Sequence, residues 1–198
     1  MASRLHEVPV AWMRTEYGYW IGHGLLPLSV HHLIGDVLSS YDNFVGAFAG
    51  SKKTADLSWS PRINDGELTE FPTIALESGW SESQAQLERD SQLWLQGSAG
   101  AVKVVLLFKF FRANIHNEIK ATLTVSRFAD NALVMDSYAI FPPPAEPDHD
   151  PCITVEELFG GRYPIGQNPQ TLFPLSLPRL RHLAEKEIRK QGYIPMAN

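Results

Sequence analysis

The stretch Phe71-Pro-Thr-Ile-Ala-Leu-Glu77-Ser-Gly79-Trp80 organises the rest of the chain. Its first half has the apolar composition of a short buried strand, and this strand is predicted to end on the acidic residue Glu77. Gly79 follows two residues later, where we expect a break and then a helix. An unpaired carboxylate at the edge of a core is costly, so proteins usually balance it with a metal ion, a cation or a proton. Glu77 is therefore the first candidate for a functional residue.

A second run of strand-like sequence, 54–61, precedes this stretch and predicts a hairpin. Asn64-Asp-Gly-Glu67 lies between the two runs and has the composition of a turn. If the hairpin is centred on Gly66 and Glu67, Asp56 falls opposite Glu77. Opposed side chains in a ladder lie about 5 Å apart at Cβ. This register would bring two acidic side chains together at one end of the hairpin.

The sequence pattern before the hairpin changes at Ser29. Residues 1–28 are rich in aromatic residues and glycine, and we expect them to be irregular or to form a peripheral strand. From Ser29 onward apolar residues recur at helical spacing, which predicts an amphipathic helix over 29–41 that Ser29 caps. His31 and His32 open this segment, and they fit either surface positions or phosphate contacts at the rim of a site.

The sequence after the opening stretch predicts a helix and then a central strand. Ser81 and Gln84 have the spacing of a capping box, and Gly97 is placed to end the helix. Residues 102–111 are almost continuously apolar, which is typical of a strand buried on both faces.

The C-terminal half predicts two further strands and two helices. Residues 118–127 and 132–141 alternate as an antiparallel pair, and Thr154 can cap a short helix. A final amphipathic helix is expected over 178–190, with a basic outer face that fits either a solvated surface or a phosphate-binding one. We therefore expect an α/β or α+β fold, with a mixed central sheet flanked by helices. One domain is expected in three parts: an extension (1–28), the core with its added strands (29–141), and a proline-rich segment with the last helix (142–198).

Composition narrows the function classes. The chain has 198 residues, of which 44% are hydrophobic, and a net charge of −5, which argues against a protein that coats nucleic acid non-specifically. A nuclease remains compatible, because a local groove can be basic in an acidic protein. Cys152 is the only cysteine, so a disulfide within the chain and a cysteine-based zinc site are excluded. The sequence shows no signal peptide and no membrane span, so we expect an intracellular protein, cytoplasmic or nuclear, and leave its oligomeric state open.

Three pieces of this sequence resemble the PD-(D/E)XK nuclease superfamily, which has the restriction-endonuclease-like fold. They are Ala55-Asp56, the run 72–81, and the strand 102–107 after the intervening helix. They are similar in particular to a branch of restriction-endonuclease-like proteins whose catalytic lysine has moved from the motif strand to the following helix. The resemblance spans about 30–110, less than half of the chain. It implies a core of helix, three-stranded meander, helix and strand, with Mg²⁺, or alternatively Mn²⁺, bound by Asp56 and Glu77 for hydrolysis of DNA.

The chain departs from that pattern at the catalytic cation. Gly79 occupies the position of the motif lysine, and the helix positions to which the related branch moves it contain none. Two basic residues remain as candidates for the catalytic cation that acts with the two acids. They are Arg89 on the helix and Lys103 on the next strand. Two hypotheses follow. One is a Mg²⁺-dependent nuclease, and the other is a catalytically inactive relative that serves as a protein- or nucleic-acid-interaction module.

Overall fold

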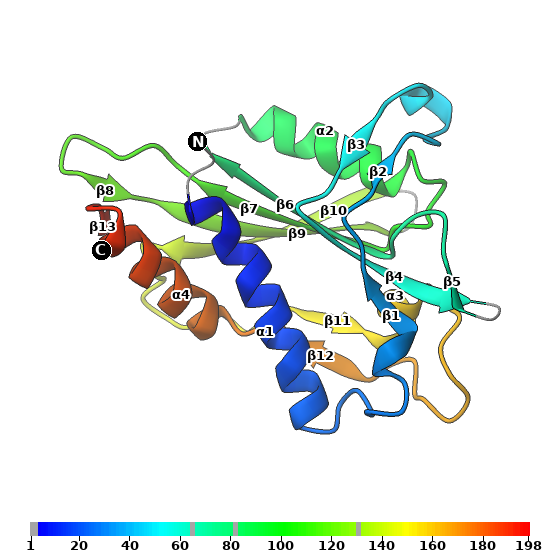
Figure 1. Cartoon of the computed structure of the whole chain (residues 1–198). Coiled ribbons are helices and arrows are strands. Elements are labelled where there is room, and N and C mark those ends of the chain that lie inside the picture. The colour runs from blue at the N-terminus through cyan, green and yellow to red at the C-terminus, as the bar shows by residue number, and fades with distance from the viewer. Residues whose placement is uncertain (1–3, 64–65, 81–82, 130–131) are drawn as a thin grey trace.

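The centre of the molecule is a mixed seven-stranded sheet with helices on both sides (Figure 1). The computed structural model describes residues 4–63, 66–80, 83–129 and 132–198. Six strands cross the sheet in the order β1, β4, β6, β7, β9 and β10, and β5 adds to β4. Neighbours are antiparallel, except that β6 and β7 run parallel because α2 connects them. The strands are β1 (Ile34–Asp36), β4 (Leu57–Ile63), β5 (Glu67–Leu68), β6 (Ile74–Trp80), β7 (Val104–Phe110), β9 (Ala121–Ala129) and β10 (Ala132–Phe141).

Successive residues of β6 point to opposite faces of the sheet and so enter two separate apolar cores. Leu76 belongs to the larger core, which it shares with Trp12 of α1 and Leu180 of α4. Ala75 belongs to the smaller core, which it shares with Trp94 of α2. The helices that form these layers are α1 (Val8–Gly22), α2 (Gln84–Leu95) and α4 (Leu177–Lys190).

Short elements surround this sandwich. α3 (Val155–Phe159) carries a complete capping box between Thr154 and Glu157, which confirms the predicted helix start. Among the described residues, no helix is long and apolar enough to cross a membrane. The remaining elements are the 3₁₀ helices η1 (Arg4–Glu7), η2 (His31–Leu33) and η3 (Gly46–Phe48) and the short strands β2 (Ser40–Tyr41), β3 (Lys53–Thr54), β8 (Glu118–Ile119), β11 (Cys152–Thr154), β12 (Leu172–Pro174) and β13 (Ile194–Pro195).

The predicted fold class is confirmed. The sheet is mixed, helices flank it, β9 and β10 form the added antiparallel pair, and α4 is the amphipathic C-terminal helix, followed only by the short strand β13 among the described elements. All seven residues of β7 are buried, including Lys109, which interrupts the otherwise apolar run that predicts this burial.

The prediction for residues 1–28 is wrong, because they contain the long helix α1. Pro9 lies in its first turn, where the missing amide hydrogen costs nothing. The buried side chains of α1 are spread around much of the helix, because α1 packs both on the sheet and on α4. This distribution leaves no single apolar stripe, and Gly18 and Gly22 lower the intrinsic helix propensity further.

The predicted helix over 29–41 is also wrong. His31 and His32 lie in the short 3₁₀ helix η2, and the chain then extends as β1, where Ile34 pairs with Pro61 of β4. Val30, Ile34 and Val37 are β-branched residues that suit a strand, and pairing along the sheet edge decides the conformation. Their helical spacing is therefore coincidental.

In the stretch around Glu77, both the end of the strand and the start of the following helix differ from the prediction. β6 continues through Gly79 to Trp80, so Glu77 lies inside the strand. α2 begins at Gln84, and the side chain of Ser83 caps it by accepting a hydrogen bond from the amide of Gln86. The predicted cap Ser81 lies outside the described residues.

An ion pair between a buried glutamate and a partly exposed arginine joins α1 to α4. Glu16 is fully buried, and its carboxylate accepts hydrogen bonds from Nε and Nη2 of Arg179 at 2.7 and 2.6 Å and from the amide of Ser176 at 3.2 Å. The Arg179 guanidinium also lies 3.9 Å from the ring centre of Tyr19. Arg179, a residue of the basic face of α4, therefore stabilises the packing of α4 against α1.

Arg179→Ala is expected to lower the free energy of unfolding by about 3 kcal/mol, because it leaves the Glu16 carboxylate buried and unpaired. Urea denaturation of the full chain measures this change. Arg189→Ala is the matched control, since Arg189 pairs with Glu185 on the exposed surface and such pairs contribute less than about 1 kcal/mol. If both variants lower the free energy of unfolding equally, the ion pair with Glu16 contributes no more to stability than an exposed surface pair.

Candidate active site

One of the two predicted acids, Glu77, lies in β6, and the other, Asp56, comes just before the neighbouring strand β4. Leu57 of β4 pairs with Leu76 of β6, and the same register continues through the next two residues. Extended by one residue beyond Leu57, this register would place Asp56 opposite Glu77, as the sequence predicts. The amide of Asp56 still donates to the carbonyl of Leu76 at 3.0 Å, so the chain stays attached to β6 at this point.

The Asp56 carboxylate is fixed by the backbone of β6. Its Oδ2 accepts a hydrogen bond from the amide of Ser78 at 2.6 Å and lies 3.5 Å from Nε2 of His6 in η1. Burial raises the pKa of Asp56, whereas the Ser78 amide, His6 and Lys53 act in the opposite direction. Asp56 is therefore held in place by the backbone rather than turned into solvent.

The Glu77 carboxylate is more deeply buried and is held by one hydrogen bond and one ion pair. Its Oε1 accepts a hydrogen bond from the indole Nε1 of Trp94 on α2 at 2.8 Å and lies 3.6 Å from Nζ of Lys53. Burial raises the pKa of Glu77 from 4.5 to about 7, although Lys53 and Trp94 both favour the charged form. Asp56 and Asp90 add smaller repulsive contributions that raise this pKa.

Lys53 is the cation of this site, and it comes from β3. Its ammonium lies between Glu77 and Asp90, with Oδ2 of Asp90 at 3.3 Å. Two neighbours hold this arrangement. Tyr41 pairs with Lys53 in the two-stranded sheet and packs edge-on against Trp94, and Gln86 donates to the other oxygen of Asp90 at 3.2 Å.

The three carboxylates of this cluster exceed its positive charge. Asp56, Glu77 and Asp90 are balanced by one lysine, and His6 adds a charge only when it is protonated. Their side chains expose 24%, 13% and 9% of their surface, so water screens this excess only in part. The cluster is therefore suited to take up a further cation or protons.

The structure does not bring the other two predicted catalytic residues to the acids. Arg89 is exposed on α2, whereas its neighbour Asp90 is buried and faces the site. Lys103 precedes β7 by one residue, and its Nζ donates to the carbonyl of Gly100 at 2.6 Å. Glu77 pairs with Leu107 of β7, and Lys103 precedes Leu107 by four residues. At the rise of a strand, Lys103 therefore lies about 13 Å along the sheet from the level of Glu77.

Sequence reasoning missed Lys53, Asp90, Trp94 and His6. Lys53 precedes Asp56 by only three residues, and this proximity was the one signal for it. His6 lies in a segment that was expected to be irregular. Asp90 and Trp94 are four residues apart and so share a face of α2, but only the packing of α2 shows that this face meets Glu77.

Other candidate groups do not form a competing site. Within the described residues, no three or more His, Cys, Asp or Glu side chains gather as a ready metal-binding cluster, and this holds for the acids around Lys53 as well. Nδ1 of His31 lies 2.6 Å from the carbonyl of Leu28, and His32 is exposed. On the basic face of α4, Arg189 and Lys190 form ion pairs with glutamates of the same helix, as expected of a solvated surface, whereas Arg179 pairs with the buried Glu16.

Because Glu77 titrates at a higher pH when folded, it makes the stability of the metal-free protein depend on pH. The folded state retains its proton up to about pH 7, while the unfolded chain loses it near pH 4.5. This contribution is complete below pH 4.5 and is lost as the pH rises through 7, a change on the order of 3 kcal/mol. Urea denaturation in EDTA at pH 5 and pH 8 should therefore show a smaller pH difference for Glu77→Gln than for wild type. Identical pH profiles for the two proteins would contradict the raised pKa.

No family model matches this chain, and neither the curated proteins nor the solved structures contain a match to it. The functional conclusion therefore depends on the geometry of the site.

Proposed function

We propose that this chain is a Mg²⁺-dependent hydrolase of DNA phosphodiester bonds, in which Lys53 replaces the lysine that the motif strand lacks. The observation that carries the proposal is the contact between Lys53 and Glu77, with Asp56 just before the neighbouring strand β4. A lysine beside two acids is the set of side chains that the resemblance to PD-(D/E)XK nucleases requires. Here the lysine comes from a separate strand rather than from two residues after the acid.

The order of elements supports the same proposal. α1 is followed by β1, β4 and β6, which form an antiparallel meander, and then by α2 and the parallel strand β7. This is the helix, three-stranded meander, helix and strand that the resemblance implies. In that scheme α1 takes the place of the helix that the sequence analysis assigned to 29–41.

The side chains present fit a hard divalent cation. Mg²⁺ binds through one or two carboxylates and keeps water or phosphate oxygens in its other positions, so it needs no larger group of protein ligands. Asp56 and Glu77 would hold the ion, and the excess of negative charge around them favours it. When bound, Mg²⁺ lowers the pKa of a bound water and stabilises charge on the phosphate.

The chain supplies positioning and a proton donor. Asp90 holds the Lys53 ammonium, which can then donate a hydrogen bond to the attacking water or to a phosphate oxygen. Trp94 orients the Glu77 carboxylate by binding one of its oxygens, and the Ser78 amide does the same for Asp56. These fixed donors reduce the rearrangement that the reaction requires.

Cleavage assays on the full chain test the proposal. Single- and double-stranded DNA are incubated with wild type in Mg²⁺, in Mn²⁺ and in EDTA, and we expect cleavage with either ion and none in EDTA. Absence of cleavage of both substrates in both ions would contradict the proposal and favour the interaction module. Cleavage in EDTA would contradict the role of the metal ion.

A further inference from the structure

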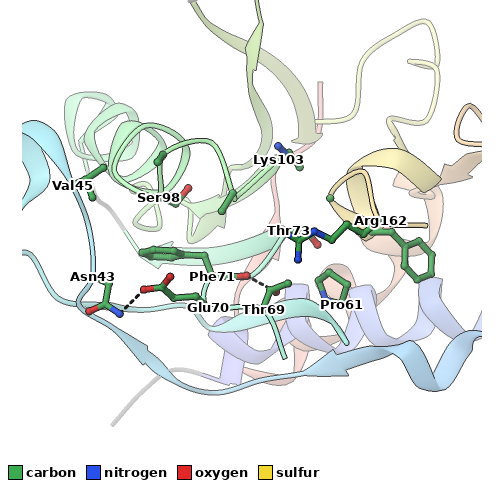
Figure 2. A pocket seen from close by; sticks show the side chains of 14 residues that line it. Asn43, Val45, Pro61, Thr69, Glu70, Phe71, Thr73, Ser98, Lys103 and Arg162 are labelled. Atoms are coloured by element: carbon green, nitrogen blue, oxygen red, sulfur yellow. Dashed lines mark hydrogen bonds between the residues drawn. The ribbon is translucent and has the colours of Figure 1, made fainter. Parts of the chain in front are cut away.

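A separate pocket of about 500 Å³ opens at the far end of β6 from the acids (Figure 2). Its volume lies within the range of small-molecule sites. Phe71 and Thr73 border it just before β6, Ser98 and Lys103 come from the connection between α2 and β7, and Arg162 comes from the segment after α3. Several parts of the chain thus converge on one cavity.

Two aromatic side chains, one from each apolar core, form part of the pocket lining. Phe71 and Phe159 line it, and both are buried. The ring of Phe71 stacks on Tyr41 with 5.8 Å between centres and packs against Phe44 at 5.1 Å. A flat apolar group can therefore enter against a surface that is already formed, which limits the ordering that binding requires.

Two cations border the same cavity. The Lys103 ammonium uses one donor on the carbonyl of Gly100 and retains two more. Figure 2 shows the Arg162 side chain extended toward Thr73, and no described carboxylate lies within ion-pair distance of its guanidinium. Glu70 is the acidic residue of the lining, and its carboxylate accepts a hydrogen bond from Asn43 at 2.7 Å. The lining therefore carries a net charge of +1.

Ser98 adds a buried donor. Its Oγ accepts a hydrogen bond from the amide of Val102 at 3.0 Å, which leaves the hydroxyl hydrogen for another acceptor. Ser98 exposes only 4% of its surface, so a ligand oxygen would meet this hydroxyl with little competition from water.

An adjoining hollow of about 310 Å³ shares Lys103 and Gly160 with the pocket, but it is less suited to an anion. Its own arginine, Arg127, is already paired with Glu157 at 2.6 Å, and Glu156 lines it as well. An anionic group is therefore favoured on the side between Lys103 and Arg162.

We propose that the 500 Å³ pocket binds a small organic anion, a phosphate or a carboxylate, attached to a flat apolar body. Lys103, Arg162 and Ser98 bind the anionic group, and the body packs over Phe71 and Phe159. Lys103 lies about 13 Å along the sheet from the level of Glu77, so this site is separate from the acids and does not depend on the proposed hydrolysis.

Calorimetric titration of the full chain tests this proposal with five probes. Adenosine monophosphate and benzoate are the flat anions, adenosine and benzyl alcohol are their neutral counterparts, and inorganic phosphate lacks the apolar body. We expect at least one flat anion to bind about tenfold or more tightly than its neutral counterpart and than inorganic phosphate. Comparison of the two flat anions distinguishes a phosphate ligand from a carboxylate ligand.

Variants locate the binding. Lys103→Gln and Arg162→Gln should each weaken the bound anion about tenfold or more, while Lys186→Gln, which removes a charge from the exposed surface of α4, should bind as wild type does. DNA cleavage should be the same in all three variants. The proposal is overturned if neither flat anion binds, if a neutral counterpart binds equally well, or if both pocket variants bind like wild type.

Discussion

Replacing Lys53 with glutamine is expected to lower the rate of DNA cleavage at least about 100-fold, the range typical of losing a positioned proton donor. The substitution keeps a polar side chain, though a shorter one, and removes the ammonium that lies between Glu77 and Asp90. Single-turnover cleavage in Mg²⁺ measures the effect directly. Lys53→Arg should restore only part of the rate, because arginine keeps the charge but does not exchange a proton with the attacking water.

Lys52→Gln is the matched control for this prediction. Lys52 precedes Lys53 in sequence and is exposed, so its loss removes the same charge without touching the acids. We expect cleavage close to the wild-type rate. If the two glutamine variants lose activity equally, the effect comes from the general charge of the protein and Lys53 has no specific role.

Glu77→Gln is expected to have a larger effect on cleavage, about 1000-fold. A bound metal ion supplies several kcal/mol of charge stabilisation, and each 1.36 kcal/mol corresponds to a factor of ten in rate. The amide keeps the shape of the side chain and can still accept from Trp94, but it is a poor ligand for Mg²⁺. The rate is measured in the same single-turnover assay at saturating Mg²⁺.

Folding and catalysis can be separated in this variant. Since burial disfavours the Glu77 carboxylate, Glu77→Gln should be at least as stable as wild type at pH 8, so lost activity cannot be attributed to unfolding. Glu67→Gln is the control, because Glu67 is exposed on β5. If Glu77→Gln cleaves DNA at the wild-type rate, Glu77 has no role in catalysis.

The hairpin register and the central strand were predictable because local rules determine them. A constant sum of residue numbers follows from antiparallel pairing, and the prediction that opposes Asp56 and Glu77 agrees with the ladder from Leu57 to Trp59. The nearly continuous apolar run of β7 likewise indicates burial on both faces. Thr154 and Glu157 form their capping box with neighbours that lie within one helical turn.

The cation of the site was not predictable by the same rules. Lys53 reaches Glu77 because β2 and β3 pair beside the main sheet and because Trp94 packs against Tyr41. These are contacts between segments far apart in sequence. The helix α1 escaped prediction for a related reason, since a helix that packs on two partners loses the one-sided pattern of a surface helix.

The alternative function, an inactive interaction module, predicts a different behaviour for the same cluster. In that case Lys53 and Asp90 would serve only to neutralise buried acids, and Lys53→Gln would lower stability with no activity to lose. An unpaired buried carboxylate costs several kcal/mol in such a network. Urea denaturation of Lys53→Gln beside its cleavage assay distinguishes a purely structural lysine from a catalytic one.

The central claim is that Asp56 and Glu77 together hold one divalent metal ion, and calorimetric titration of Mn²⁺ and Mg²⁺ into the metal-free chain tests it most directly. The account predicts one ion per chain for wild type and none for the double variant Asp56→Asn/Glu77→Gln, with circular dichroism confirming that the variant is folded. Wild type that binds no ion, or a double variant that binds it as tightly as wild type, would contradict the account.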